Sequence, residues 1–401
     1  MDKDSKKIQN FIKKITKKQK DKKRTSQKFS RESRLFIEKI FNQINQAGSL
    51  FNNSNISKTK LNEMPTGEYY YLLEDPVKLA IENQLKIFQK TTFSIENRNF
   101  EIFMSFSSKL NDAIMDKWIK YIYIWLNIAC KYAMPSCSNN LAVYFYFTDM
   151  KKLMPDDGDK IMEADNVNTA FTFACNAPNK TRKNEIYVYR LEEWFKVFLH
   201  ESIHSFGLDF AAMDQTDIQS RICTTDIYKV PCQDLRFYES YTETWAELIY
   251  CMFAIFFENK TNMQENKNVS KFEEHIYGCE APFSAFQCAK VLDHFGLAYS
   301  DLFDGAASQY RESTPVFAYY VIKSVFMNNA DEFIRWTMEN NRGSLQFKKT
   351  QTNINLLADL LKSLCKTEDY LKLMDDMDEV LDGPMDYMLA ETMRMSCISF
   401  D

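Results

Sequence analysis

The spacing of apolar residues predicts both helices and strands in the first half of the chain. From residue 108 to 133, apolar side chains recur every three or four positions, so we expect a long amphipathic helix capped by Ser107 or Ser108. β-Branched and aromatic residues run together in segments that are predicted to be strands: 93–95, 100–106, 141–148, 168–175 and 185–190. The polar residues between the first two strands predict a hairpin.

Helical spacing predominates elsewhere. Asp75 and Pro76 are typical of a helix start, and this helix is predicted to reach about residue 89, after a shorter helix at 34–45. Another helix is expected from about residue 191 to Gly207, because glycine suits the position after a helix end. Beyond about residue 236 the pattern is helical throughout. The predicted fold class is α+β, with a small, mostly antiparallel sheet and helices, followed by an all-helical C-terminal lobe.

Composition and charge refine this picture. Only 9 glycines and 9 prolines occur in 401 residues, which favours long helices and few tight turns. Residues 1–34 contain 14 Lys or Arg and 4 Asp or Glu, a net charge of +10, which leaves −15 for the remainder because the whole chain carries −5. Such a segment buries too little apolar surface to fold alone and is expected to be a mobile tail.

The basic run at 17–24 is expected to contact nucleic acid or an anionic surface, or else only to keep the protein soluble. The chain is therefore expected to divide into a basic disordered tail (1–34), a helical segment with a linker (35–92), an α+β subdomain (93–210) and a helical subdomain (211–401).

Ten cysteines are scattered through the chain without a Cys-x-x-Cys pair. Most lie in apolar runs, so reduced, buried thiols are expected rather than a zinc ribbon or a secreted disulfide scaffold. The N-terminus has no apolar stretch of the signal-peptide type, and the longest apolar run, 248–257, is about half a membrane span. We therefore expect an intracellular protein without a transmembrane segment, located in the cytoplasm, the nucleus or a virion.

Two of the four histidines stand in the sequence His200-Glu201-Ser202-Ile203-His204, an HExxH motif. Apolar residues just upstream put this motif on a buried helix. Because residues i and i+4 of a helix share a face, both imidazoles can bind one zinc ion. Glu201 is then expected to take a proton from zinc-activated water. The alternative is two core histidines with Glu201 in a salt bridge.

A third zinc ligand is expected from later in the chain. Phe210 occupies the position at which an HExxHxxGxxH motif has its third histidine, and Asp209 is one place too early. Glu239, Glu243 and Glu247 stand at i, i+4 and i+8, where like charges repel unless a cation lies among them. A solvated acidic first helical turn is the alternative explanation.

These motifs resemble those of the HExxH zinc metallopeptidases, and among them the gluzincins. That group takes its third ligand from a later helix, in an E-x-x-x-D/E pattern whose second acid hydrogen-bonds a liganding histidine. The resemblance implies Glu243 as the ligand and Glu247 as the second acid, while Glu239 with Glu243 fits the same pattern one turn earlier. The order of elements over 93–260 is also similar to the zincin fold. In that fold the strand before the HExxH helix, here 185–190, is the sheet edge that holds an extended peptide.

The resemblance implies zinc-dependent hydrolysis of a peptide or protein substrate, with the zinc in a cleft between the sheet and the helical lobe. His294 and the pair Tyr319 and Tyr320 are candidates for the oxyanion donor, and the alternative for each is a packed helical residue. A non-catalytic zinc-binding protein with a structural or host-interaction role is the alternative function. A composition rich in Lys, Asn, Ile, Phe and Tyr suggests the AT-rich genome of a large DNA virus or a protist.

Overall fold

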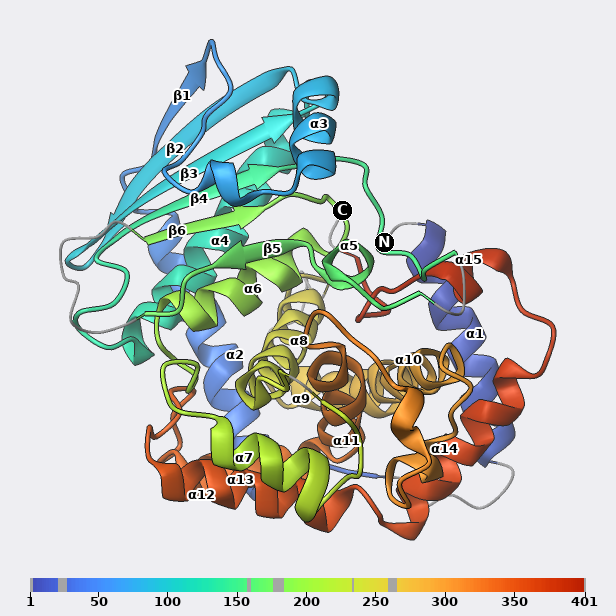
Figure 1. The fold of residues 1–401 in the computed structure, drawn as a ribbon. Helices are drawn as coiled ribbons and strands as arrows, with labels where there is room; N and C mark the ends of the chain where they lie inside the picture. The colour runs from blue at the N-terminus through green and yellow to red at the C-terminus, as the bar shows by residue number, and fades with distance from the viewer. Residues whose placement is uncertain are drawn as a thin grey trace. The chain divides into compact units, whose positions relative to one another are not determined.

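The computed structural model describes residues 3–20, 27–156, 160–175, 184–232, 234–258 and 265–399. The chain forms two compact units, and each is described by itself below (Figure 1). The sheet unit comprises Lys39–Lys151 and Asn168–Ala212, and the helical unit comprises Met1–Glu38, Lys152–Val167 and Met213–Asp401. The N-terminal segment therefore belongs to the helical unit instead of forming a separate part.

The sheet unit contains a six-stranded sheet in the order β1-β2-β3-β4-β6-β5. β4 pairs in parallel with β3 and with β6, and the other three pairings are antiparallel. The expected hairpin is β2–β3, in which Phe93 lies opposite Phe100 and Glu96 takes a positive φ of 51° in the turn. The α+β class is confirmed at this level. The strands are β1 (Ser57–Leu61), β2 (Ile87–Ile95), β3 (Arg98–Phe106), β4 (Asn140–Tyr146), β5 (Ala170–Thr172) and β6 (Asn184–Val188).

Helices cover both faces of this sheet. Alternate residues of β4 point to opposite faces, as strand geometry requires. Tyr144 joins a buried cluster with Ile81 of α3, whereas the ring of Phe145 lies 5.5 Å from that of Phe198 on α6. Besides the second part of α2 (Arg31–Phe51), the helices of this unit are α3 (Asp75–Gln84), α4 (Asp112–Tyr132) and α6 (Trp194–Ser205).

The start of α4 differs from the prediction. The side chain of Asn111 accepts a hydrogen bond from the backbone N–H of Ala113 at 2.8 Å, so the helix begins at Asp112 rather than after Ser107 or Ser108. Asparagine and serine are equally good caps, and the sequence pattern alone does not choose between them.

The edge of the sheet also differs from the prediction. The segment 185–190 was expected at the edge, but β6 pairs with β4 on one side and with β5 on the other. β5 is therefore the edge strand, and only residues 170–172 of the predicted strand 168–175 pair with the sheet. The prediction failed because strand order depends on pairing, which the apolar pattern of one segment does not contain.

Helix α8 (Phe237–Glu258) forms the core of the helical unit, because all its residues from Glu239 to Ile255 are buried. Two π-helical turns, η3 (Ile276–Glu280) and η6 (Phe317–Ile322), precede α10 and α11. No helix in the described part of the chain is long and apolar enough to cross a bilayer. The other helices are α2 (Arg31–Phe51), which continues into the sheet unit, α5 (Ala164–Val167), α7 (Thr216–Ser220), α9 (Glu265–His275), α10 (Ala281–Asp293), α11 (Lys323–Asn328), α12 (Ala330–Asn340), α13 (Gln351–Leu364), α14 (Glu368–Leu381) and α15 (Tyr387–Glu391).

The expected mobile tail is instead largely a helix, α1 (Lys3–Lys20). Ile8 and Ile12 are fully buried on one face, and the ring of Phe11 lies 5.2 Å from that of Phe286 on α10. The prediction was wrong because the count of charges concealed apolar residues at helical spacing. Residues 21–24 of the basic run lie outside the described residues. The contact of this segment with nucleic acid or an anionic surface stays a prediction.

Candidate metal centre

The HExxH residues lie on α6, and every residue of this 12-residue helix is buried. The helix ends at Ser205 because Gly207 adopts a positive φ of 64°. Its N–H donates to the carbonyl of His204 at 3.0 Å, and the next N–H, of Leu208, donates to the carbonyl of Ile203 at 2.9 Å. This is the glycine turn that the sequence predicted.

His200 and His204 direct their imidazoles to a common point. Their Nε2 atoms lie 3.0 Å apart, and each residue is only 6% exposed. Two ligands of a tetrahedral zinc ion with bonds of about 2.05 Å would be about 3.3 Å apart. The pair therefore fits two corners of a zinc site.

Asp209 orients one of these imidazoles. Its carboxylate contacts Nδ1 of His204, and it is 1% exposed. Because a carboxylate only accepts hydrogen bonds, this contact assigns a proton to Nδ1 and leaves Nε2 of His204 with a lone pair for a metal. Carboxylates commonly orient zinc-binding histidines in this way. Motif spacing places Asp209 one position too early for a ligand, and it does not show the turn at Gly207 that brings Asp209 back to His204.

Buried hydrogen bonds hold α6 in position behind the motif. The hydroxyl of Ser202 accepts from the indole N–H of Trp125 at 2.6 Å and donates to the carbonyl of Phe198. Glu201, between this serine and His200, is 8% exposed. A helix anchored by Ser202 therefore holds Glu201 and the two histidines in one fixed frame.

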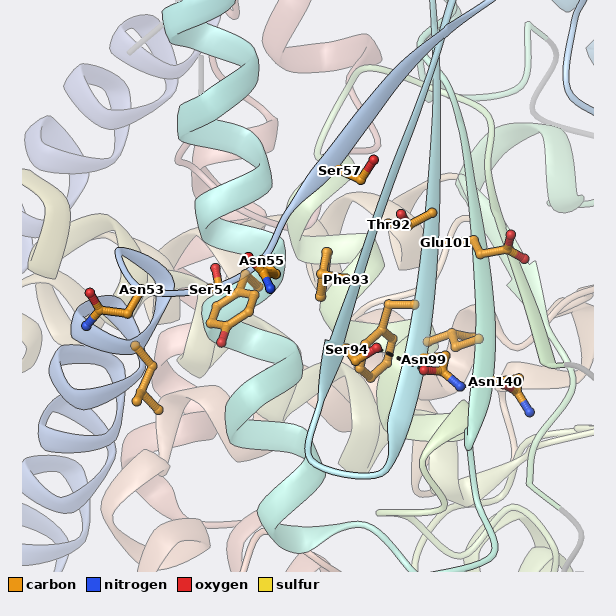
Figure 2. A pocket seen from close by; sticks show the side chains of 14 residues that line it. Asn53, Ser54, Asn55, Ser57, Thr92, Phe93, Ser94, Asn99, Glu101 and Asn140 are labelled. Carbon is orange, nitrogen blue, oxygen red and sulfur yellow. Dashed lines mark hydrogen bonds between the residues drawn. The ribbon is translucent and has the colours of Figure 1, made fainter.

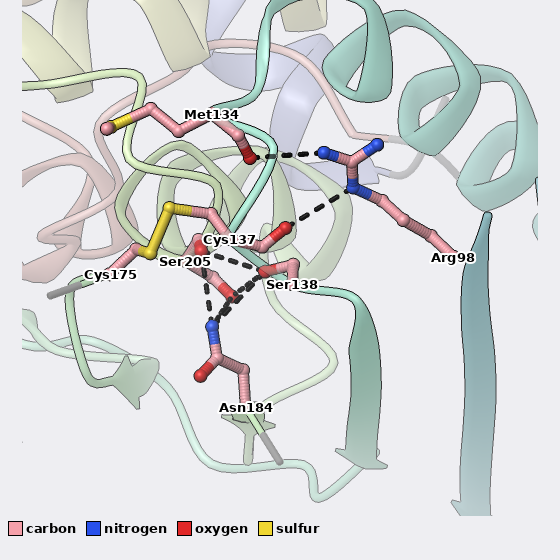
Figure 3. The surroundings of a disulfide bond; sticks show 7 residues. All are labelled: Arg98, Met134, Cys137, Ser138, Cys175, Asn184 and Ser205. Carbon is pink, nitrogen blue, oxygen red and sulfur yellow. Dashed lines mark hydrogen bonds between the residues drawn. A yellow bond between two sulfur atoms is a disulfide. The ribbon is translucent and has the colours of Figure 1, made fainter. Parts of the chain in front are cut away.

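A disulfide between Cys137 and Cys175 lies at the C-terminal end of α6 (Figure 3). The N–H of Cys175 donates to the carbonyl of His204 at 3.0 Å, and the hydroxyl of Ser138 donates to the carbonyl of Ser205 at 2.8 Å. These bonds satisfy carbonyls at the helix end. The crosslink thus joins the chain that follows β5 to the segment between α4 and β4, and both segments hydrogen-bond to the end of the histidine helix.

For this one pair the expectation of reduced thiols was wrong, because two cysteines 38 residues apart have no local signal of pairing. The other eight cysteines are buried thiols, as expected. Disulfides persist mainly in oxidising compartments, and the expected cytoplasmic location stays a prediction.

The acidic residues expected to supply the third ligand lie on α8, in the helical unit. Glu239 and Glu243 are buried, as are His200 and His204 in the sheet unit. Glu247 is fully buried, and its carboxylate accepts from the ammonium of Lys323 at 2.7 Å. Burial raises the pKa of Glu247 to about 8, with Lys323 acting in the opposite direction. The contact with Lys323 occupies one carboxylate oxygen, and the expected role of Glu247 as the acid that holds a liganding histidine stays a prediction.

The candidates for an oxyanion donor also belong to the helical unit. The hydroxyl of Tyr320 is buried and donates to the carbonyl of Met393 at 2.6 Å, as a packed core residue does, and its catalytic role stays a prediction. Nε2 of His294 faces the carbonyl of Lys160 at 2.9 Å and so carries a proton that the backbone already accepts. Tyr319 is partly buried in η6, and its role stays a prediction.

The sheet unit also has a separate groove of about 980 Å³, between the segment after α2 and strands β2 to β4 (Figure 2). Its lining is mainly neutral and polar, with Ser94 and Asn99 hydrogen-bonded at 2.9 Å, and Glu101 is its one charged residue. No histidine or cysteine lines it, so it offers none of the ligands typical of zinc.

Comparisons with known proteins add no assignment. No protein-family model matches the chain, and no curated protein or solved structure matches it significantly. The chemistry of the site therefore rests on its own geometry.

Proposed function

We propose that this protein is a zinc-dependent peptidase whose zinc is held by His200 and His204. The observation that carries the proposal is the convergence of their Nε2 atoms at 3.0 Å on a buried helix, with Asp209 on Nδ1 of His204. Glu201 is the neighbour of His200 on the same helix. A zinc ion bound there supplies a Lewis acid that polarises a peptide carbonyl and lowers the pKa of a water to about 7.

We assign the third protein ligand to Glu239 on α8, with Glu243 as the acid behind it. The contacts of Glu247 support this choice, because its carboxylate binds Lys323 in its own unit. α8 contains two E-x-x-x-E pairs, Glu239 with Glu243 and Glu243 with Glu247, and only the first pair does without Glu247. The assignment therefore moves the ligand one helical turn from the position first expected.

Glu201 is the general base and acid of the proposed reaction. Its carboxylate takes a proton from the attacking water and delivers it to the leaving amine as the peptide bond breaks. A glutamine at this position keeps the shape of the side chain but cannot accept that proton.

The substrate in this proposal is an extended peptide that adds to the free edge of β5. Within the described sheet, β5 pairs on one side only, with β6, and an edge strand offers unpaired backbone groups to a peptide. The chain continues from Thr172 to Cys175, whose N–H bonds the carbonyl of His204. In the sheet unit, a peptide on this edge would therefore run toward the histidine helix.

The experiment compares wild-type protein with Glu201→Gln, using Glu82→Gln on the exposed face of α3 as a matched control. Zinc content and cleavage of a diverse peptide library are measured for each. We expect all three to retain zinc and only Glu201→Gln to lose activity, by about 10²–10⁴-fold.

Undiminished cleavage by Glu201→Gln would overturn the mechanism. Zinc in all three proteins with no cleavage by any would favour the non-catalytic zinc-binding role. Loss of zinc in Glu201→Gln alone would make Glu201 part of the binding site rather than the base.

A further inference from the structure

A second group of metal-ligand side chains lies wholly within the helical unit. It comprises Cys251 on α8, His275 at the end of α9 and Glu280 at the end of η3. One ligand atom of each lies within 4.8 Å of the others. Cys251 and Glu280 have no exposed surface, and the side chain of His275 is 18% exposed.

Glu280 is held in one orientation by the buried C-terminal segment. One oxygen, Oε1, accepts from the hydroxyl of Ser396 at 2.9 Å and lies 3.3 Å from Nε2 of His275. The other, Oε2, accepts from the backbone N–H of Cys397 at 3.0 Å. The carboxylate is therefore fixed before any ligand arrives, which lowers the cost of binding one.

The thiols of Cys279 and Cys397 lie beside this group. The thiol of Cys279 is hydrogen-bonded to the side chains of His275 and Cys397. The thiol of Cys251 is hydrogen-bonded to Glu280. Cys279 follows His275 by four residues and so shares its helical face, which places a fourth donor beside the three already named.

We propose that Cys251, His275, Cys279 and Glu280 bind a zinc ion. Sulfur, imidazole nitrogen and a single carboxylate oxygen are the donors that zinc takes in tetrahedral sites, whereas calcium and magnesium take oxygen donors. The ion would join α8 to the turn between α9 and α10. This site shares no ligand with the proposed peptidase site, although Cys251 lies on α8 as Glu239 and Glu243 do.

The chemistry also explains why these groups are buried together. A buried carboxylate is costly unless a cation or strong donors compensate its charge. The alternative compensation is a protonated His275 alone, hydrogen-bonded to Glu280 and Cys279 without a metal. The two arrangements differ in a measurable way, because only zinc converts the thiols to bound thiolates.

The test uses full-length protein expressed with zinc, in four forms: wild type, Cys251→Ser, His200→Ala and the double variant. Cys288→Ser, another fully buried thiol of the helical unit, is the matched control. We expect about one zinc ion fewer in Cys251→Ser than in wild type, no loss in Cys288→Ser, and a further loss in the double variant. Equal zinc in wild type and Cys251→Ser would overturn the proposal.

Loading His200→Ala with cobalt in place of zinc gives a second readout that does not depend on the folding of Cys251→Ser. We expect thiolate-to-cobalt charge-transfer absorption from the remaining site, and its loss when Cys251 is also replaced. Absence of this absorption, or a Cys279–Cys397 disulfide found by non-reducing peptide mapping, would overturn the proposal. If the proposed peptidase site failed to bind zinc, His200→Ala would have the same zinc content as wild type. The zinc content of Cys251→Ser would still decide whether the second site binds zinc.

Discussion

The contact between Asp209 and His204 predicts that Asp209→Asn weakens zinc binding without removing a ligand. The carboxylate contacts Nδ1 of His204 in a buried site, so it orients the ring and stabilises positive charge on it when Nε2 binds a metal. Asparagine has nearly the same size but no charge. Its oxygen still accepts from Nδ1, whereas its amide group, if turned inward, would favour the wrong tautomer.

The magnitude follows from the type of hydrogen bond that is lost. A bond to a charged group contributes about 1.5–3 kcal/mol and a neutral one about 0.5–1.5 kcal/mol. The difference between the centres of these ranges is about 1.3 kcal/mol, which is about tenfold in a dissociation constant. This value lies at the lower end of the 10–100-fold losses of metal affinity that are typical when such a partner is replaced.

The assay is a competition for zinc between the protein and a chromophoric chelator, performed on Cys251→Ser protein so that the histidine site is measured alone. Asp116→Asn is the control, because Asp116 lies in the same unit in an exposed ion pair with Lys58. We expect the dissociation constant to rise about tenfold for Asp209→Asn and to stay unchanged for the control. Equal constants for Asp209→Asn and wild type would refute the orienting role.

Three further predictions concern separate parts of the chain. Cys137→Ser should lower the free energy of unfolding by about 4 kcal/mol in urea without reductant, since the bond closes a loop of 38 residues; equal midpoints would contradict this. Burial raises the pKa of Glu247 from 4.5 to about 8 in the folded protein, so between these pH values the folded state binds a proton that the unfolded state has lost. The free energy of unfolding of the wild type should therefore fall by about 1.4 kcal/mol per pH unit in this range relative to Glu247→Gln. Parallel stability curves for the two proteins would show that no such proton is held. Glu239→Ala should weaken zinc binding more than Glu243→Ala, and the opposite order would return the ligand to Glu243.

Local patterns in the sequence predicted most elements of the sheet unit. The β2–β3 hairpin from residue 93 on, the strand β4 and the histidine helix with its terminal Gly207 all follow from residues close together in the chain. The start of β2 was not predicted, because the preceding helix ends at Gln84 and not near residue 89. Periodicity and capping act over a few residues, and a sequence displays them directly. The α1 helix was missed although Ile8 and Ile12 carry the same signal, because net charge was given more weight than spacing.

The features that could not be predicted depend on contacts between distant residues. The edge position of β5 is set by strand pairing, and the Cys137–Cys175 bond joins two separate loops. Asp209 is only five residues from His204, yet its role depends on the backbone turn between them. In the candidate site the motif gave the two histidines, and the residues that orient and fasten them came from tertiary structure.

The most direct test of the central claim is anomalous diffraction at the zinc absorption edge, from crystals of the full chain purified with zinc. The account predicts an anomalous peak at about 2.0–2.1 Å from Nε2 of both His200 and His204, with a carboxylate of α8 completing the protein ligands. Ordered His200 and His204 side chains with no peak between them would contradict it.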